Sequence, residues 1–548
     1  MSICLRALLG LPLVLLLQTA VLSPAFAGAT INVTTTADGV EGNGNCTLRE
    51  AIIAANTDSA VDTCPAGSGA DTIALPPGTY VLSRAGPRED AAATGDLDIT
   101  SELTIAGPGR VVTTLDGGSR REALGDRVLH VLPGGHLAIS GVTVRGGYCA
   151  SGGGILNAGW LAITDSTVKD NVASEIADEC WAPIPTGGAG IYNTGELHIV
   201  RSTLSDNWMY GTASYSDVAS PGGGLLNKGT AVITASVVIR NFAASGGGIR
   251  NDLDLRLVET WVANNSARFY GAGLDNMGHA DLSRGAVSGN VDGGILNGRP
   301  GAPATLRLDT VTVSANRSHR LYGSIHNWGG TVAIQNSTIA GNYSVEAPGG
   351  IWGPAQVVNT LIANGPYGDC AGAITSLGYN LDTDGTCGLT RPSDLPLSDP
   401  GLGPLTDNGG PTPTHALNAW SVALDRIPEA ACLGGLDQRG VSRPYPAHGA
   451  CDVGAYERSP AGDITLLLDA VRSGARQGLL TRPEEQALVS SLKAAWLAIM
   501  NGNPESACVY LDDFAETVAE YVGHQRLDPV VAGAWGRAIK RIKSMVCT

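Results

Sequence analysis

The sequence contains few aromatic and few charged side chains. Aromatic residues make up 5% of the 548 residues, and charged residues make up 16%, against about 25% in an average soluble domain. The charges sum to −16, so basic residues are outnumbered. Because binding to the phosphate backbone of nucleic acids needs clustered Lys and Arg, this composition predicts no nucleic-acid partner.

A long apolar run is found only near the N-terminus. Arg6 precedes a Leu-rich stretch over residues 7–22, and an Ala-x-Ala pattern follows and ends at Ala27. This is the pattern of a secretory signal peptide over residues 1–27. A membrane anchor is the alternative, which the Gly, Pro and Gln inside the short run disfavour. We expect a secreted or cell-surface protein with no transmembrane segment after signal removal.

The cysteines lack the spacing of a metal site. There is no CxxC pair and no matching His spacing, so we expect no zinc and no other metal at these residues. Cys4 leaves with the signal peptide, and the even number that remains in an exported chain indicates disulfides, with the connectivity left open. The neighbours along the sequence are Cys46 and Cys64, Cys149 and Cys180, Cys370 and Cys387, Cys432 and Cys451, and Cys508 and Cys547.

Glycine is abundant, at 74 residues, and much of it recurs in one motif. The unit is Gly-Gly-Gly-Ile-x-Asn or a close variant, and in five copies a second Asn follows the first after fourteen residues. A fixed interval of this kind indicates a structural repeat. The pairs are Asn157 and Asn171, Asn193 and Asn207, Asn227 and Asn241, Asn251 and Asn265, and Asn276 and Asn290.

Without insertions, one repeat spans about 21 to 25 residues and contains short stretches of alternating apolar and polar residues. Such a turn has room for short strands but not for a helix, and stacked turns of this length form a parallel β-solenoid. Gly allows positive φ at the corners, and Asn can align its amide with the Asn of the next turn. A flat β-sandwich is the alternative, but it needs no constant interval. We therefore predict a mainly β chain.

The repeats over residues 81–364 resemble the right-handed parallel β-helix of bacterial surface and polymorphic outer-membrane proteins. Before them, Cys46-Thr-Leu-Arg-Glu-Ala51 resembles the CSLREA domain, which implies an N-terminal cap over residues 28–80. Thr47 and Glu50 have capping-box spacing. We expect a short helix that covers the open strand edges of the first turn.

Residues 365–458 resemble a choice-of-anchor Q domain through motifs such as Cys451-Asp-Val-Gly-Ala-Tyr-Glu457. The resemblance implies a C-terminal cap before a surface-sorting tail. Segment 419–425 departs from the Pro- and Gly-rich pattern of that family, so its conformation stays open. Residues 459–548 resemble a FIMAH-type helical domain, since apolar residues recur at helical spacing. The expected helices cover residues 466–471, 484–500, 506–522 and 530–545.

Secreted β-helix proteins include polysaccharide lyases and glycoside hydrolases, so catalytic groups are of interest. Two carboxylates can act as acid and base on a glycosidic bond, whereas a lyase uses an Arg or Lys base. The alternative is that acidic loop residues are simply solvated on a chain of this charge. No GxSxG elbow is present. The candidates, none of them in a recognised motif, are Glu175, Asp178, Asp206, Arg201 and Arg250.

One motif bears on calcium. Asp382-x-Asp384-Gly385 resembles the start of a calcium loop, but the acidic residue that should close the loop is missing at the required distance. A turn explains the motif better. We therefore expect no cofactor, and calcium occupancy stays open.

The two longest insertions, residues 172–187 and 208–221, leave the same corner of consecutive turns and must lie side by side. Solenoids place functional insertions on one face, and sugar rings stack on exposed aromatic planes. We therefore predict a glycan-binding groove at this corner; the alternative is that the rings only pack the loops. The aromatic residues concerned are Trp181, Trp208, Tyr210, Tyr215, Tyr270 and Tyr322.

The expected function is binding of an extracellular polysaccharide or another cell-surface component through this corner. A polysaccharide lyase or glycoside hydrolase that acts in the same groove is the first alternative, and a structural spacer is the second. A spacer needs no aromatic insertions, and a binding protein needs no acid–base pair.

Overall fold

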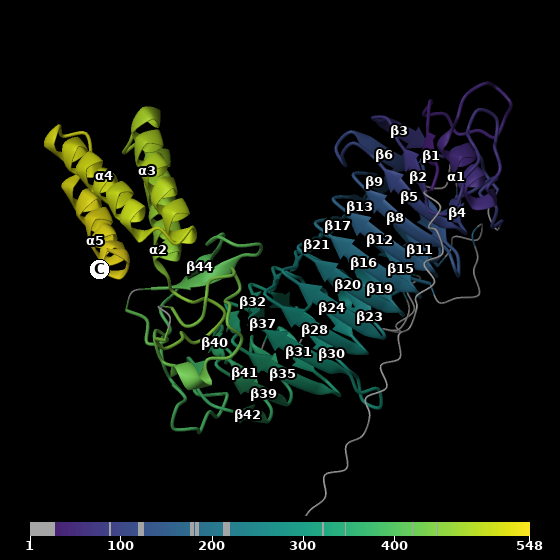
Figure 1. The fold of residues 1–548 in the computed structure, drawn as a ribbon. Helices are drawn as coiled ribbons and strands as arrows, with labels where there is room; N and C mark the ends of the chain where they lie inside the picture. Colours follow the sequence, from purple (N-terminus) through teal and green to yellow (C-terminus); the bar gives the residue numbers. More distant parts are fainter. Residues whose placement is uncertain are drawn as a thin grey trace, which may run out of the picture.

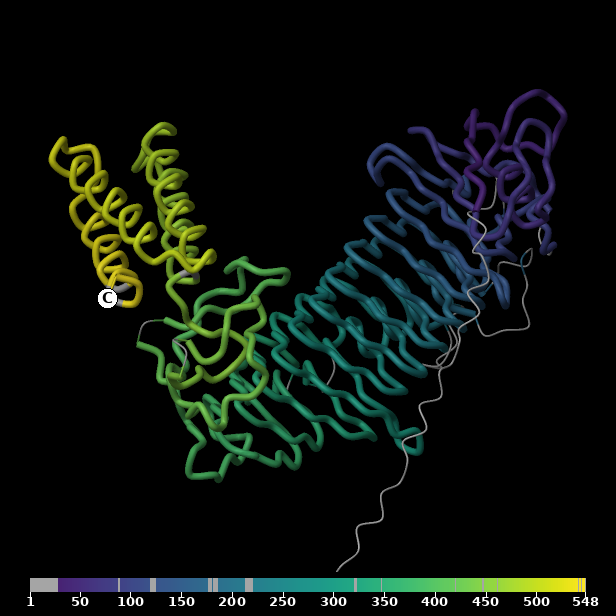
Figure 2. Tube along the Cα trace, viewed as in Figure 1, coloured from purple at the N-terminus to yellow at the C-terminus, as the bar shows by residue number. Residues whose placement is uncertain are grey.

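The computed structural model describes residues 28–86, 89–118, 125–175, 180, 186–211, 220–319, 323–345, 347–418, 420–445 and 448–547. These residues form a parallel β-helix followed by α-helices (Figure 1). Figure 2 shows the chain as a stack of similar coils from the N-terminal end to the middle of the sequence, with the helices beyond the last coils. The mainly β solenoid that the repeat predicts is therefore confirmed.

The 11-stranded sheet that contains the first asparagine of each repeat is here called the asparagine sheet, and the 13-stranded sheet is called the broad sheet. Each complete turn begins with a strand of the asparagine sheet and continues into the broad sheet, whose strands are mostly five residues long. All pairings in both sheets are parallel. The asparagine sheet contains β4 (Leu97–Ile99), β7 (Leu129–Val131), β11 (Ile155–Asn157), β15 (Ile191–Asn193), β19 (Leu225–Asn227), β23 (Ile249–Asn251), β27 (Leu274–Asn276), β30 (Ile295–Asn297), β34 (Ile325–Asn327), β38 (Ile351–Trp352) and β41 (Cys370–Ala371). The broad sheet contains β1 (Thr30–Asn32), β2 (Asp71–Ala74), β5 (Glu102–Ala106), β8 (His136–Ser140), β12 (Trp160–Thr164), β16 (Glu196–Val200), β20 (Thr230–Thr234), β24 (Asp254–Val258), β28 (His279–Ser283), β31 (Thr305–Asp309), β35 (Thr331–Gln335), β39 (Ala355–Val358) and β42 (Ile374–Ser376).

The chain then enters a 12-stranded sheet, called the narrow sheet, and in several turns it continues into a 5-stranded sheet, called the corner sheet. The narrow sheet contains β3 (Gly78–Val81), β6 (Thr113–Asp116), β9 (Thr143–Arg145), β13 (Thr167–Lys169), β17 (Thr203–Ser205), β21 (Val237–Ile239), β25 (Trp261–Ala263), β29 (Ala286–Ser288), β32 (Thr312–Ser314), β36 (Thr338–Ala340), β40 (Leu361–Ala363) and β43 (Leu381–Asp382). The corner sheet contains β10 (Tyr148–Cys149), β14 (Val172–Ser174), β18 (Trp208–Tyr210), β22 (Phe242–Ser245) and β26 (Ser266–Tyr270), and β33 (Arg317–Ser318) pairs with β37 (Tyr343–Ser344) further along.

Alternation along each strand places every second side chain inside the solenoid. In β12, Leu161 and Ile163 are buried, whereas the residues between them face outward. In-register pairing sets Leu161 beside Leu197 and Ile163 beside Ile199 of the next turn. Burying one such side chain contributes roughly 1.5–3 kcal/mol. The stacked apolar rows form one continuous core and are the main source of stability.

Buried asparagines run along two corners of the solenoid. Asn157 Nδ2 donates to Asn193 Oδ1 at 2.7 Å, and the same bond recurs turn after turn to Asn327. In the second row, Asn207 Nδ2 donates to Asn241 Oδ1 at 3.0 Å. The predicted alignment of amides between turns is confirmed. Because these amides also bond backbone groups in the turns, they satisfy donors and acceptors that water does not reach.

Helix α1 (Leu48–Thr57) closes the N-terminal end of the core. The Thr47 side chain accepts a hydrogen bond from the Glu50 N–H, and the Glu50 carboxylate accepts one from the Thr47 N–H, so the expected capping box is present. Asn56 Nδ2 donates to the Asp98 carbonyl at 2.7 Å, and Asn56 Oδ1 accepts from the Thr100 N–H at 3.0 Å. These bonds cover the open edge of β4.

A second cap, built around β44 (Leu402–Thr406), β45 (Thr414–Leu417) and the short η1 (Glu429–Ala431), packs at the other end. It contacts the side of the solenoid as well as its last turns. The Thr312 hydroxyl donates to Gln438 Oε1 at 2.6 Å, and Ser314 Oγ lies 2.8 Å from His415 Nε2. The cap therefore covers part of the outer face of the narrow sheet.

The helical domain consists of α2 (Pro460–Arg476), α3 (Arg482–Met500), α4 (Pro504–Gly523) and α5 (Pro529–Val546). Its separate core includes Leu492, Phe514 and Ile542. Each helix has Pro in its first two positions, and the Asn503 side chain accepts from the Ser506 N–H at 3.1 Å. The helices extend a few residues beyond the predicted ranges, because capping residues precede the apolar periodicity.

The sheets extend past both ends of the glycine repeat. At the N-terminal end, β1 already pairs with β2 and β3 pairs with β6, and at the C-terminal end β41, β42 and β43 still pair with β38, β39 and β40. Pairing continues there because inward side chains such as Cys370 and Leu381 remain buried, although the Gly-Gly-x motif has ended. The strands thus depend on the apolar pattern rather than on the glycines.

All five expected cysteine pairs are bonded, Cys46–Cys64, Cys149–Cys180, Cys370–Cys387, Cys432–Cys451 and Cys508–Cys547. Disulfides of this number are typical of oxidising, extracytoplasmic compartments. In the part of the chain that the structure describes, no helix combines the length and the apolar character needed to cross a membrane.

Candidate functional site

The aromatic corner is centred on strand β18. Met209 is buried, so its neighbours Trp208 and Tyr210 point outward, where they are 41% and 44% exposed. This alternation follows from strand geometry, because residues i and i+2 share one face. Two large aromatic side chains are thereby held at the surface by a rigid strand.

Trp208 stacks on Phe242 of the next turn. The ring centroids are 4.4 Å apart with an interplanar angle of 25°, and Tyr210 lies 5.7 Å from Trp208. In the preceding turn the smaller Val172 pairs in register with Trp208, and Gly146 and Gly147, just before Tyr148 in the turn before that, also line the space beside the indole. This space is a cavity of about 240 Å³ that is lined by Gly146, Gly147, Asp170, Val172, Asp206, Trp208 and Tyr210.

The carboxylates of Asp170 and Asp206 lie at the edge of this cavity, at equivalent positions in adjacent turns of the solenoid. Asp206 forms a double ion pair with Arg240, with Nε 2.7 Å from Oδ1 and Nη2 2.8 Å from Oδ2. Burial raises the pKa of Asp206, but hydrogen bonds from Arg240 and Ser205 outweigh burial and leave the pKa below its ordinary value. Asp206 therefore stays ionised at neutral pH and accepts hydrogen bonds, which does not suit a general acid.

Glu175 lies near Tyr210, at the start of the first insertion. Its N–H donates to the Tyr210 carbonyl at 3.2 Å, and its carboxylate accepts a hydrogen bond from the Ser220 hydroxyl. The structure thus places Glu175 beside the aromatic corner, joined to the end of the second insertion. Of the other predicted residues in the two insertions, Asp178, Trp181 and Tyr215 lie outside the described residues, as does Tyr322.

The two candidate arginines are elsewhere. Arg201 occupies the turn between the broad and narrow sheets and forms an exposed double ion pair with Asp165. Arg250 is buried on the outer side of the asparagine sheet, 2.5 Å from Asp252 and 2.6 Å from Asp275. Of the candidate catalytic residues that the structure describes, Glu175 and Asp206 lie near the aromatic corner, whereas Arg201 and Arg250 lie elsewhere and are engaged as ion-pair partners.

Tyr270 belongs to a second aromatic group. Its ring centroid lies 5.6 Å from that of Trp328, which stacks on His326 at 5.5 Å. His326 is buried on the asparagine sheet, and burial lowers its pKa to about 4. This group packs around Trp328, and the assignment of Tyr270 to the glycan-binding groove stays a prediction.

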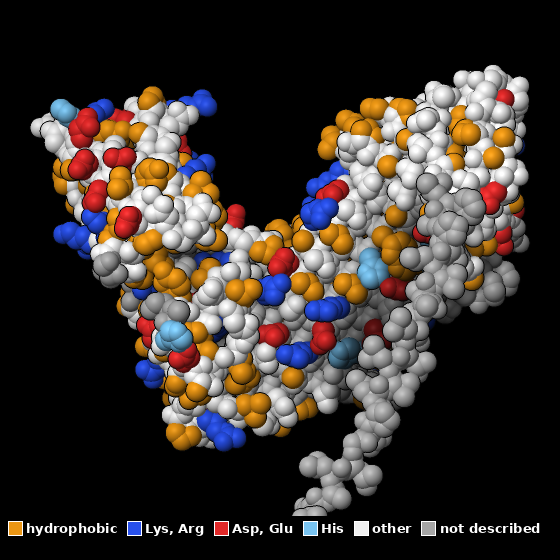
Figure 3. Space-filling view, in the orientation of Figure 1, with side chains coloured by type: hydrophobic (Ala, Val, Ile, Leu, Met, Phe, Trp, Pro, Cys, Tyr) orange, Lys and Arg blue, Asp and Glu red, His pale blue; other side chains and the backbone are white. Residues whose placement is uncertain are grey.

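The broad sheet carries a larger hollow, of about 550 Å³. Within it, Asp281 stands between Arg256 and Arg307 in the strand register, and His279 Nε2 lies 3.3 Å from Asp281 Oδ2. Figure 3 shows acidic and basic side chains together over the middle of the face on which these strands are labelled in Figure 1. Because acidic and basic side chains lie together on this face, it offers both hydrogen-bond donors and acceptors to a polar polymer, and not an electrostatic potential of a single sign.

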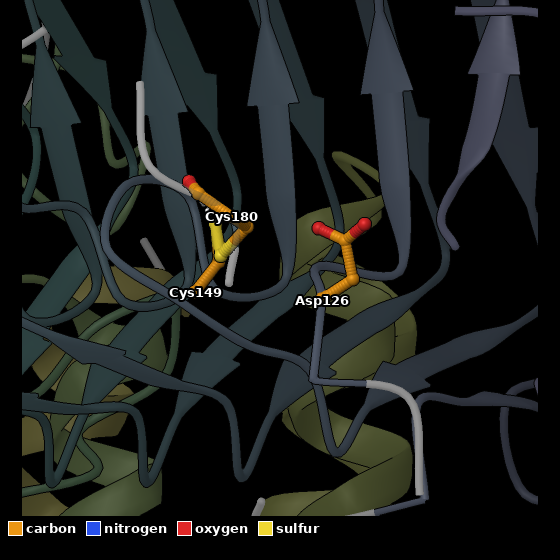
Figure 4. A group of neighbouring side chains, drawn as sticks. All are labelled: Asp126, Cys149 and Cys180. Atoms are coloured by element: carbon orange, nitrogen blue, oxygen red, sulfur yellow. Dashed lines mark hydrogen bonds between the residues drawn. A yellow bond between two sulfur atoms is a disulfide. The ribbon is translucent and has the colours of Figure 1, made fainter. Parts of the chain in front are cut away.

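Buried acids gather in the first turns, beside the Cys149–Cys180 disulfide. Figure 4 shows the Asp126 carboxylate near that bond. Arg127 donates to Asp96 Oδ2 at 3.0 Å and to Cys149 Sγ at 3.2 Å. Asp126 and the two sulfurs are close enough for metal ligands, but disulfide sulfurs are not thiolates, so this group does not provide a zinc site.

Asp98 and His130 form a strongly perturbed pair in this cluster, beside Asp96, whose pKa burial also raises. His130 Nδ1 lies 3.1 Å from Asp98 Oδ1. Burial raises the pKa of Asp98 to about 7, with a contribution from the nearby Glu89 and Asp90 charges, and burial lowers the pKa of His130 to about 4. Between these values the pair holds one proton. Asp90 completes a possible two-carboxylate, one-histidine metal group.

The raised pKa of Asp98 predicts a pH effect on stability. The folded state binds the proton more tightly than the unfolded chain, so the stabilisation is complete below pH 4 and is lost as the pH rises towards 7. Asp98→Asn mimics the protonated acid; we expect equal unfolding midpoints in urea near pH 4 and a variant more stable at pH 8, by on the order of 2–4 kcal/mol. Asp254→Asn, at an exposed position on β24 away from this cluster, is the control; equal pH profiles for Asp98→Asn and the parent chain would contradict the prediction.

Sequence reasoning missed two residues of the aromatic corner. Asp170 precedes Asn171 as Asp206 precedes Asn207, and Phe242 follows Asn241 as Trp208 follows Asn207. The fourteen-residue register therefore contained the signal for both. Comparisons with protein-family models, with characterised proteins and with solved structures find no match to this chain.

Proposed function

We propose that this chain is an exported β-helix protein that binds an extracellular polysaccharide at the corner formed by Trp208 and Tyr210. The observation that carries the proposal is the cavity beside two exposed aromatic rings, Trp208 and Tyr210, of which Trp208 stacks on Phe242. The C–H groups of a sugar ring pack on the negative face of an aromatic system. Concave sites with aromatic walls and a few polar groups are typical of small-ligand binding.

The polar groups suggest a neutral sugar. Asp170 and Asp206 offer carboxylate oxygens to sugar hydroxyls, and no Lys or Arg is among the described residues that line the cavity. Arg240 and Lys169, which pair with Asp206 and Asp170, do not line the cavity, so among the described lining residues no cation is available to an acidic sugar. The proposed ligand class is therefore a neutral hexose polymer, with one sugar stacked on Trp208.

Export and surface location are part of the same proposal. The N-terminal pattern over residues 1–27 and the five disulfides support an oxidising compartment outside the cytoplasm. The resemblance of the flanking segments to CSLREA and choice-of-anchor Q domains supports a place at the cell surface.

The experiment is a binding and cleavage screen of residues 28–548 against neutral and acidic polysaccharides, by affinity electrophoresis followed by mass spectrometry of the polymer. We expect retardation by at least one neutral polymer, which is left intact. Unsaturated chain ends would instead establish a lyase, and hydrated ends a hydrolase. If no polymer retards the protein, a structural spacer becomes the better interpretation.

A further inference from the structure

Three aspartates meet at the C-terminal end of the solenoid. Asp369 precedes β41, Asp382 ends β43, and Asp384 lies in the turn that follows. One carboxylate oxygen of each lies within 4.8 Å of the other two. The Cys370–Cys387 disulfide joins the two segments that carry them. The carboxylates are therefore held together by covalent structure as well as by strand pairing.

Local hydrogen bonds set the directions of these side chains. The Cys387 N–H donates to Asp382 Oδ2 at 3.1 Å, and the Thr386 N–H donates to Asp384 Oδ1 at 3.0 Å. Gly385 has φ +77°, which lets the chain reverse sharply between them. The turn thus wraps around its own two carboxylates, as expected for the first half of a calcium loop.

Asp369 ties the turn to the preceding segment. Its Oδ2 accepts hydrogen bonds from the N–H and the hydroxyl of Thr383, both at 2.7 Å, and its own N–H donates to Asp384 Oδ2 at 3.1 Å. Asp369 comes thirteen residues before Asp382. The motif Asp382-x-Asp384-Gly385 has no closing acidic residue at the required distance on its C-terminal side. The third carboxylate therefore comes from Asp369, on its N-terminal side.

The independent observation concerns Asp382. Its side chain is completely buried, its Oδ2 accepts a hydrogen bond from the Cys387 N–H, and its Oδ1 has no donor in hydrogen-bond geometry among the described residues, although the Leu397 N–H also acts on this carboxyl. Oδ1 is therefore the oxygen of Asp382 that remains available to a cation. A buried carboxylate oxygen without a donor or a cation is strongly unfavourable.

We propose that Asp369, Asp382 and Asp384 bind one Ca²⁺ ion. Calcium takes oxygen ligands at about 2.3–2.6 Å, so the ligand oxygens around one ion lie at most about 5 Å apart; one oxygen of each of these aspartates lies within 4.8 Å of the other two. The set contains no imidazole and no thiolate, which disfavours zinc or copper. Waters and backbone carbonyls complete the coordination. The ion joins the last turn of the solenoid to the segment before β41 and does not depend on glycan binding.

The test uses residues 28–548 freed of divalent ions with EGTA and then titrated with CaCl₂ by calorimetry, together with thermal unfolding. We expect one bound ion per chain, with a dissociation constant of about 1 mM or below, as for extracellular sites, and a Tm at least about 2 °C higher with saturating calcium. An equal response to MgCl₂ would contradict the assignment to calcium.

Asp384→Asn is the decisive variant, because Asp384 is exposed and its replacement leaves no buried gap. We expect its calcium affinity to fall at least about tenfold, since affinity follows the charge of the ligand set. Asp407→Asn is the matched control, an exposed aspartate that also bonds a backbone N–H in a turn, that of Gly409; its affinity stays that of the parent. No calcium response in the parent chain, or an unchanged affinity in Asp384→Asn, would overturn the proposal.

Discussion

Replacing Trp208 and Tyr210 together by Ala is expected to abolish retardation of the protein by its polysaccharide. Both rings are about two-fifths exposed and form the wall of the 240 Å³ cavity. Aromatic side chains at the centre of a binding site commonly contribute about 2 kcal/mol or more, roughly a 30-fold change in affinity each. The double variant should therefore lose binding within the range of affinity electrophoresis, whereas each single variant should weaken it.

The control must show that the loss belongs to this corner and not to a damaged fold. Tyr343 is 43% exposed on β37, several turns away, and its ring lies 6.5 Å from that of Tyr367. Tyr343→Ala removes a comparable exposed ring and should bind as the parent does. Circular dichroism and the unfolding midpoint should be unchanged in all variants. Unaltered binding by the double variant would remove the aromatic corner as the site.

The fold could be predicted from the sequence because the same Gly and Asn motif, with the same interval, recurs in successive turns. The Asn157 and Asn171 series fixed the register, and the structure shows each Asn beside its counterpart in the next turn. A single position such as Asp170 carries no such signal by itself. Its equivalence to Asp206 becomes visible only when successive turns are superimposed, since parallel pairing places equivalent residues about 4.8 Å apart.

The grouping of Asp369, Asp382 and Asp384 could not be predicted from the repeat in this way. Asp382 and Asp384 form a local motif, but Asp369 belongs to the previous part of the coil, and its distance from the others depends on the path of the intervening chain. The packing of Gln438 and His415 against the narrow sheet is also long-range. Contacts between a non-repeating cap and a repeating surface leave no periodic signal.

The second large effect is expected from the buried asparagine row. Asn265 Oδ1 accepts hydrogen bonds from the N–H and the Nδ2 of Asn241, while its own Nδ2 donates to the Val238 carbonyl and to Asn290 Oδ1. Asn265→Ala leaves these buried groups unpaired, each at about 1–3 kcal/mol, and should destabilise the central turns by roughly 3–5 kcal/mol. Asn265→Asp should be worse, because it places a charge where two acceptors converge.

Asn264→Asp makes the same chemical change one residue earlier, at an exposed position with φ +50° that Asp also tolerates. We expect its unfolding midpoint in urea to stay close to that of the parent, and Asn265→Asp to lower the midpoint or the yield of folded protein sharply. Amide exchange separates the domains: protection should fall in β21 and β25, while α2 to α5, which have their own core, remain protected. Equal behaviour of the two variants would show that the core tolerates loss of one amide, and that apolar stacking alone maintains the register.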